Sequence, residues 1–214
     1  SDYNTTGSID SRVKANPTYG QSIVSYTGTG ANATVGHGLS AAPEMMIIKR
    51  RSSSQSWFVY HSGLNVDGDN APQTDAIKLN STAAAFDDDG AWNDTAPTNA
   101  LFNLGSSGGV NQSSGTYINY CFHSVTGYSK IGSYSGTGST QTITTGFRPA
   151  WIIVKRTNSA EGWMIFDSAR EPSNPLKARL LADVADDEVT NQTFGNFIDT
   201  GFTLTSSWGG VNGS

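Results

Sequence analysis

The sequence predicts an all-β fold made of two tandem antiparallel β-sandwich modules of the jelly-roll or concanavalin-like kind. Three observations support this prediction. The chain repeats itself at a period near 100 residues, it is rich in glycine but poor in charge, and its short apolar runs alternate with clusters of turn residues. A repeat of that period indicates copies of one domain rather than a solenoid of short units.

The repeat is clearest at a glycine-containing segment. Residues 25–30 (SYTGTG) return as residues 133–138 (SYSGTG), 108 residues later. The run WFVYHS at 57–62 returns as WMIFDS at 163–168. The other matched pairs are Gly38-Leu39 with Gly146-Phe147, Met46–Arg50 with Ile152–Arg156, and Gly108–Asn111 with Gly209–Asn212. The two halves therefore follow one pattern of apolar and turn residues.

The composition narrows the class of protein. Charged residues make up 14% of the 214 residues, and 24 are glycine, which suits β-structure with tight turns and neutral polar surfaces. A net charge of −5 argues against nucleic-acid binding. No apolar run is long enough for a membrane helix, so no membrane insertion is expected. Cys121 is the only cysteine, which excludes an intrachain disulfide and predicts a small buried side chain.

In the first half, alternating apolar runs bounded by Gly, Asn, Ser and Pro predict seven strands. They lie near residues 22–27, 32–36, 44–50, 56–62, 75–80, 99–104 and 116–123. The matching strands of the second half are expected near 129–135, 140–144, 150–156, 162–168, 178–182 and 201–206.

At one segment, helix propensity and the internal repeat predict different secondary structure. Propensity alone favours a helix over Leu176–Asp183. Its counterpart, Asp75–Ser81, has the pattern of a strand that leads into a turn. Because copies of one module keep their element types, a strand is predicted here.

These elements predict three regions. Residues 1–20 are expected to be a linker or the end of a preceding module, 21–126 the first sandwich, and 127–214 the second sandwich without its last strand. No run matching Thr116–Phe122 follows the second GGVN element, so the chain is expected to be a segment or processed form of a longer protein. Residues beyond about 206 are then expected to be poorly ordered, unless a neighbouring chain fills the open edge by strand addition.

Candidate ligand-binding residues lie in polar loops. Trp92 is followed by Asn93 and Asp94, and Trp208 precedes a Gly-Gly turn. Exposed aromatic rings can stack on sugars, and loops at the end of a rigid sandwich commonly carry binding residues. These four residues are therefore the predicted glycan contacts.

Candidate metal ligands are acidic residues in two loops. Asp67 and Asp69 surround a turn glycine, and Asp87 and Asp89 belong to a run of three aspartates. Carboxylate oxygens beside a turn glycine suit calcium, although the trailing glutamate of an EF-hand is missing. Calcium is the only cofactor considered, and simple solvation of these acids is the alternative.

The sequence contains no catalytic constellation. His37, His61 and His123 accompany no nucleophile elbow, and the second half has Thr145 and Asp167 at the first two positions. No catalytic residue is assigned, and the chain is not expected to be an enzyme. The paired carboxylates of a glycosidase could come only from Asp87–Asp89, which leaves a polysaccharide depolymerase as a remote alternative.

Many of these residues resemble a module of marine bacteriophage (cyanophage-like) tail-fibre and virion proteins. The resemblance is carried by Ala15–Thr18, Ser22–Gly30, Val35–Leu39 with Pro43, Val59–Ser62, Trp92–Thr98, Tyr117–Phe122, Gly127–Lys130 and Gly146–Ala150. It implies a virion location after assembly in the host cytoplasm, lectin-like neighbouring domains, other appendage subunits as partners, and a homo-oligomer, with a trimer favoured.

The function expected from these features is structural and adhesive. The module would space a phage tail fibre or other virion appendage and contact host-surface glycans through loops such as 87–98. A purely architectural spacer or decoration domain is the first alternative, and the depolymerase is the second.

Overall fold

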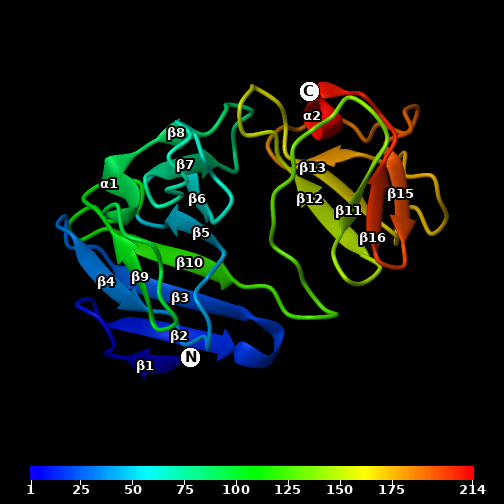
Figure 1. The fold of residues 1–214 in the computed structure, drawn as a ribbon. Coiled ribbons are helices and arrows are strands. Elements are labelled where there is room, and N and C mark those ends of the chain that lie inside the picture. Colours follow the sequence, from blue (N-terminus) through cyan, green and yellow to red (C-terminus); the bar gives the residue numbers. More distant parts are fainter. The chain divides into compact units, whose positions relative to one another are not determined.

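The computed structural model describes all 214 residues and confirms the all-β class, with several antiparallel sheets and three short helical turns (Figure 1). The chain forms two compact units. Unit 1 comprises residues 1–79, 85–125 and 129–132, and unit 2 comprises 80–84, 126–128 and 133–214. The helical turns are η1 (Pro17–Tyr19), α1 (Asp89–Trp92) and α2 (Gly209–Asn212). No helix has the length and apolar character needed to cross a lipid bilayer.

Unit 1 contains an eight-stranded sheet and a two-stranded sheet. The large sheet has the order β1-β2-β3-β10-β5-β6-β7-β8, and β4 pairs with β9 in the small one. The strands are β1 (Asp2–Asn4), β2 (Ser11–Asn16), β3 (Gln21–Thr27), β4 (Ala33–Gly36), β5 (Met45–Arg50), β6 (Trp57–His61), β7 (Asp75–Lys78), β8 (Phe86–Asp87), β9 (Leu101–Leu104) and β10 (Thr116–Phe122). All seven strands predicted for this half are present.

The core of unit 1 follows from residue alternation. In β10, Tyr117, Asn119 and Cys121 are buried while their neighbours are half-buried, as expected for a strand with one inward face. The ring of Tyr26 on β3 stacks on Tyr117 at 5.2 Å and meets the edge of Phe102 on β9 at 5.9 Å. Side chains from both sheets therefore share one core. Cys121 is fully buried as predicted, and burial raises the pKa of its thiol to about 12.

Residues 1–20 are not a linker. They form β1, β2 and η1, and β2 pairs with β3 from Ser11 opposite Tyr26 to Asn16 opposite Gln21. Ser11 and Val13 are buried, and Ile9 joins the core beside Val35. The segment is polar because only alternate residues of its short strands face inward, so its few apolar residues gave a weak sequence signal.

Unit 2 contains two three-stranded sheets, with the orders β12-β13-β14 and β11-β16-β15. The strands are β11 (Gln141–Thr144), β12 (Trp151–Val154), β13 (Met164–Asp167), β14 (Leu180–Leu181), β15 (Gly195–Ile198) and β16 (Gly201–Leu204). The strand preferred over a helix near 178–182 is confirmed as β14. By contrast, β15 was not predicted.

The repeat extends to the pairing register. Ala33 lies opposite Leu104 in the β4–β9 pair, and Gln141 lies opposite Leu204 in the β11–β16 pair. In the repeat, Ala33 corresponds to Gln141 and Leu104 corresponds to Leu204. The β5–β6 pair and the β12–β13 pair likewise have the same register at corresponding residues. The two units therefore share strand pairing as well as sequence.

Each unit is closed by a buried asparagine of its own, and the two asparagines make the same kinds of hydrogen bond. In unit 1, the Nδ2 of Asn111 donates to the carbonyl oxygens of Ala31 (2.7 Å) and Gly105 (2.8 Å), and its Oδ1 accepts from the amide of Thr29 (2.9 Å). Asn111 is fully buried. We call this set of bonds the asparagine latch.

The latch of unit 2 is made by Asn212. Its Nδ2 donates to the carbonyls of Ser139 (2.7 Å) and Ser206 (3.0 Å), and its Oδ1 accepts from the amide of Thr137 (3.0 Å). A tyrosine hydroxyl donates to the carbonyl before each latch residue: Tyr26 to Val110 and Tyr134 to Val211, both at 2.7 Å. The recurring sequence GGVN thus has a structural role in both units.

The recurring SYxGTG segment is explained by close approach to the latch. A Cβ on Gly28 would lie 2.5 Å from the carbonyl oxygen of Gln112, and a Cβ on Gly136 would lie 2.1 Å from that of Gly213. Contacts this short do not occur at real Cβ atoms. Glycine is therefore required at this position in each copy.

Two predictions for unit 2 are wrong. No strand forms over 129–135, because β3, the matching strand of unit 1, lies between β2 and β10, and this segment has no strand on either side. Residues beyond 206 are not poorly ordered: they form α2, where Val211 and Asn212 are buried. The latch, rather than a further strand, fixes this segment.

Candidate functional site

Trp92, the first predicted sugar contact, is buried and therefore cannot stack on a sugar. It ends α1, which is capped by the side chain of Asp88 accepting from the amide of Gly90. Its indole is 1% exposed, its Nε1 donates to the carbonyl oxygen of Asp75 at 2.8 Å, and its ring meets the edge of Tyr60 at 5.8 Å. The polar residues around Trp92 suggested exposure, but the short helical turn directs the ring into the core.

Asn93 and Asp94 follow this turn at the surface. Both have left-handed backbone conformations, with φ of 54° and 45°, which Asn and Asp adopt more readily than most residues. The Oδ1 of Asn93 accepts from the Nδ2 of Asn32, and Asp94 is exposed. These residues shape the chain reversal after α1, and the predicted aromatic partner beside them is missing.

Trp208, the second predicted sugar contact, is half-buried against the core of unit 2. Its ring lies 5.6 Å from Phe194, and the guanidinium of Arg179 lies 4.4 Å from its ring centre. That cation–π contact occupies one face of the indole. The indole of Trp208 therefore has less exposed ring surface than the predicted stacking on a sugar requires.

The acidic loops predicted to bind calcium share one electrostatic environment. The pKa of Asp87 is raised, first by desolvation and then by the charges of Asp89, Asp67, Asp94 and Asp69. The fold thus brings the two predicted loops near each other.

The same carboxylates do not gather as a metal site. Asp67 accepts from the amide of Asp69, and Asp69 accepts from the amide of Ala71 at 2.7 Å. No group of three or more His, Cys, Asp or Glu side chains has an arrangement that could hold a metal ion. The geometry shows Asp67 and Asp69 stabilising their own turn.

A buried carboxyl near these loops was missed by sequence reasoning. Asp75 is fully buried; its Oδ2 accepts from the amide of Val66 at 2.8 Å, and its Oδ1 has no partner. Desolvation is the main cause that raises its pKa, and the nearby charges of Asp67, Asp69 and Asp87 add to it. An Asp at the start of a strand resembles an ordinary exposed residue, so no pattern marked it.

The histidines have structural roles in unit 1. His37 is fully buried; its Nε2 lies 3.0 Å from the carbonyl oxygen of Thr98, and its Nδ1 accepts from the amide of Leu39 at 3.1 Å. In unit 2, Thr145 replaces it, and its Oγ1 accepts from the amide of Phe147 at 3.4 Å. His61 accepts from the amide of Gly63 at 2.9 Å. The two copies therefore cap the same turn with different residue types.

The buried histidines make unit 1 sensitive to mild acid. Burial is the main cause that lowers the pKa of both His37 and His61 below 6.5. The unfolded chain therefore binds protons at a higher pH than the folded unit does. The free energy of unfolding of unit 1 is expected to fall as the pH drops below about 6.5 towards the lowered folded pKa values.

This expectation can be checked by urea unfolding between about pH 7.5 and 5. The His37→Thr variant, which carries the unit 2 residue, should show a smaller loss of stability over this range, whatever its stability at pH 7.5. An unchanged pH dependence in that variant would contradict the assignment.

The most accessible aromatic site lies at the N-terminal edge of the large sheet. Tyr3 on β1 is 59% exposed, its hydroxyl donates to Oδ2 of Asp10 at 2.5 Å, and the guanidinium of Arg12 lies 5.3 Å from its ring centre. The hydrogen bond to Asp10 is the main cause that raises the pKa of Tyr3. The ring is thus both exposed and fixed in orientation.

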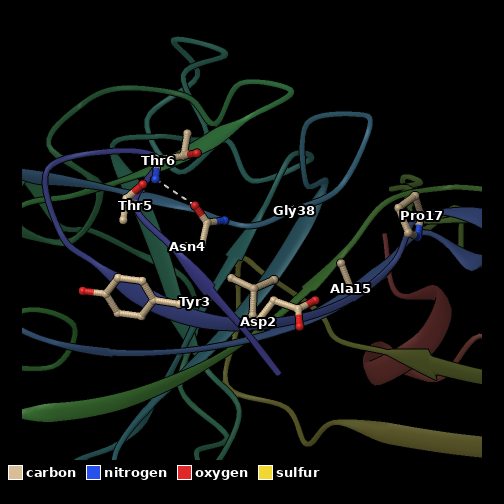
Figure 2. Close-up of a pocket in the computed structure, with 9 residues that line it drawn as sticks. Asp2, Tyr3, Asn4, Thr5, Thr6, Ala15, Pro17 and Gly38 are labelled. Atoms are coloured by element: carbon tan, nitrogen blue, oxygen red, sulfur yellow. Dashed lines mark hydrogen bonds between the residues drawn. The ribbon is translucent and has the colours of Figure 1, made fainter.

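Tyr3 borders an open depression of about 500 Å³ in unit 1. Figure 2 shows Asn4, Thr5 and Thr6 close together beside the tyrosine, with the amide of Thr6 donating to Oδ1 of Asn4 at 2.8 Å. Asp2 lines the same depression.

Tyr3 lies opposite Arg12 in the β1–β2 pair, so its side chain lies on the other face of β1 from those of Asp2 and Asn4. On that face, Tyr3 lines a second depression with Asp10, Arg12 and Ser25. An exposed aromatic ring beside carboxylate, guanidinium and hydroxyl groups has the chemistry of a carbohydrate contact.

The prediction that residues 1–20 are a linker or the end of a preceding module missed this surface. The alternation of Ser11, Val13 and Ala15 is the signal that could have identified β2. Once β2 is recognised, the short segment that precedes it becomes a candidate edge strand, with Tyr3 on it.

Comparison with known families gives one match. The model described as "Domain of unknown function (DUF7483)" matches residues 1–214. No curated protein and no solved structure matches the chain.

Proposed function

The chain belongs to the DUF7483 family, and we propose that it is a structural and adhesive module of a phage tail fibre or other virion appendage. The resemblance of its sequence to marine phage fibre modules supports the location in a virion appendage. The duplicated, charge-poor β units support a structural role, because neutral turns and repeated sheets build extended surfaces with few charges.

In this proposal, each unit is a β-sandwich. In unit 1, Tyr26 of the large sheet contacts Phe102 of the small sheet. In unit 2, Tyr134 meets the edge of Phe202 on β16 at 6.3 Å. Equivalent aromatic contacts between equivalent residues support one architecture for both copies.

The exposed ring of Tyr3 is the observation that carries the adhesive part. Its phenol is anchored by Asp10 and one face is near Arg12, so a ligand meets a ring that has little conformational freedom left to lose. The C–H face of a sugar can pack on such a ring. The polar side chains of Asp10, Arg12 and Ser25, which line the second depression with Tyr3, can then bond to sugar hydroxyls.

A glycan array of bacterial surface saccharides tests this proposal with the intact chain. We expect binding at about millimolar or lower sugar concentration, and we expect Tyr3→Ala to weaken it about tenfold while the free energy of unfolding changes little, because the ring is mostly exposed. Tyr128→Ala is the matched control, since Tyr128 is 49% exposed and lines neither of the two surface depressions of unit 1.

A spacer without affinity of its own is the second candidate. It is favoured by the burial of Trp92 and by the contact of Arg179 with Trp208, which leave the predicted loops without a free aromatic ring. Absence of any saccharide binding by the wild-type chain would support the spacer and overturn the adhesive role. Equal loss of binding in the Tyr3 and Tyr128 variants would also contradict the assignment to Tyr3.

A further inference from the structure

The second depression beside Tyr3 is basic, although the chain as a whole is acidic. Arg12 and Arg51 both line this depression, and Asp10 is its only acidic residue. The net charge of the whole chain is −5. The two guanidinium groups therefore give this part of unit 1 a charge opposite in sign to that of the chain.

The strand register places the two arginines on either side of a group of hydroxyl side chains. Arg12 on β2 lies opposite Ser25 on β3, and Thr27 on β3 lies opposite Thr116 on β10. The amide of Arg51 donates to the carbonyl oxygen of Thr116 at 2.7 Å. All five residues line the depression. A ligand in it therefore meets a guanidinium on each side and hydroxyl groups between them.

Neither guanidinium has a carboxylate partner within the chain. The three ion pairs of the structure use only Arg148 and Arg170 as cations. Arg12 lies over the ring of Tyr3, and Asp10 accepts from the hydroxyl of that tyrosine. Both arginine side chains that line the depression are exposed, so their N–H groups are accessible to a ligand.

Positive charge continues along the same face of the large sheet. Lys14 follows Arg12 on β2, two residues later, and Lys49 on β5 lies on the same face by alternation. Asp2 is the only acidic residue in β1, β2, β3, β5 and β10, and it lies opposite the buried Val13, on the other face. An anion that approaches this face is therefore attracted by several cations.

The groups that line the depression match a sugar that carries an anionic group. A guanidinium donates two parallel hydrogen bonds to a carboxylate or a phosphate, and it does so with a fixed geometry. The exposed ring of Tyr3 and the neighbouring hydroxyl groups suit the rest of a sugar. The volume of about 200 Å³ is below the about 300 Å³ typical of sites for drug-sized ligands, so one sugar ring is a suitable occupant.

We propose that the depression bounded by Tyr3, Arg12 and Arg51 binds an acidic saccharide, a sugar with a carboxylate or phosphate group. The sugar ring packs on Tyr3, and Arg51 pairs with the anionic group. Arg12 orients the tyrosine and adds a second positive charge. This inference rests on the proposed adhesive function and adds the chemical class of the sugar to it.

A saccharide fits this depression better than a nucleic acid does. Proteins that bind single-stranded nucleic acids stack successive bases on several aromatic rings along a basic groove. The other aromatic residue of the depression, Tyr26, is 5% exposed. Tyr3 is therefore a single stacking surface, which is enough for one sugar ring.

The test compares matched pairs of saccharides on the glycan array, with the full chain. Each acidic saccharide is paired with its neutral form, which is made by reducing the carboxylate to an alcohol or by removing the phosphate. We expect the acidic member of at least one pair to bind at least about tenfold more tightly than the neutral member. The pair with the largest ratio identifies the anionic group.

Arg51→Gln removes one guanidinium and leaves the contacts of Tyr3 with Asp10 and Arg12 in place. It should weaken binding of the acidic saccharide about tenfold and change binding of the neutral form by less than about twofold. Lys130→Gln is the charge-matched control, because Lys130 is exposed and lines neither depression. Both variants should unfold at the same urea concentration as the wild-type chain, since both side chains are exposed.

The possible results separate this inference from the proposed function. Equal binding of acidic and neutral forms, lost in Tyr3→Ala, would leave the adhesive function standing and overturn the acidic class. Equal losses in Arg51→Gln and Lys130→Gln would show a general attraction of charges and would also overturn it. So would an oligothymidylate that binds more tightly than every saccharide and depends on Arg51. Absence of any saccharide binding would overturn both proposals.

Discussion

Replacing Asn111 with aspartate is expected to lower the free energy of unfolding of unit 1 strongly. The change puts a carboxylate where two carbonyl oxygens now accept hydrogen bonds from Nδ2, at 2.7 and 2.8 Å from the side chain. Because Asn111 is fully buried, neither water nor a cation compensates for this repulsion. The cost is about 3–5 kcal/mol, a large fraction of the stability of a domain of this size.

Asn111→Ala separates the loss of the latch from the added charge. It leaves the amide of Thr29 and two carbonyls without their partner, which is expected to cost about 3 kcal/mol. Asn103→Asp is a comparison at a second, nearly buried asparagine, whose Nδ2 donates to the carbonyls of Thr95 and Ala96. Urea unfolding, monitored by tryptophan fluorescence, gives the free energy of unfolding of all three variants. A change below about 1 kcal/mol for Asn111→Asp would show that the latch does not hold the unit closed.

Trp92→Ala is expected to destabilise unit 1 by about 3–5 kcal/mol. The substitution leaves a cavity among core residues, since the indole is buried against Tyr60, and it removes the donor to the carbonyl of Asp75. Trp92→Phe retains an aromatic ring and should cost less, about 1–2 kcal/mol, mainly for the lost hydrogen bond. Thermal or urea unfolding gives both values.

This experiment distinguishes a core residue from a surface binding residue. An exposed tryptophan would change stability by no more than about 0.5 kcal/mol when replaced by alanine. Such a result, together with intact folding, would contradict the burial of Trp92 and restore the loop at 87–98 as a binding surface.

Most of the fold could be predicted because the chain supplies its own comparison. Leu176–Asp183 has the propensity of a helix, yet its repeat counterpart indicated a strand, and β14 confirms it. Local propensity is a weak signal that tertiary pairing overrides. The match between Asp75–Ser81 and this segment carried information that neither segment had alone.

The errors arise where a residue's environment depends on distant partners. The segment 129–135 has the same pattern as β3, but a strand needs a neighbour, and the strands that flank β3 have no counterparts in unit 2. Trp92 lies among polar residues in sequence, while its burial is decided by Tyr60 and Asp75. Local pattern could not reveal either outcome.

The candidate site was harder to predict than the fold. Tyr3 precedes β2 in a polar segment, and its exposure matters only because Asp10 and Arg12 fix its ring. The predicted calcium ligands are close enough to interact electrostatically, but the side-chain oxygens of Asp67 and Asp69 accept from backbone amides within their own turn. Sequence identified the residue types, and only the geometry shows how each is used.

The central claim is that one latch closes two copies of the same unit. Amide hydrogen exchange on the Asn111→Asp and Asn212→Asp variants tests it most directly, because exchange reports on each strand separately. We predict that Asn212→Asp removes protection from β11 and β16 while β3 and β10 stay protected, and that Asn111→Asp does the reverse. Unchanged protection of β11 and β16 in Asn212→Asp, or loss of protection in both units in either variant, would contradict the claim.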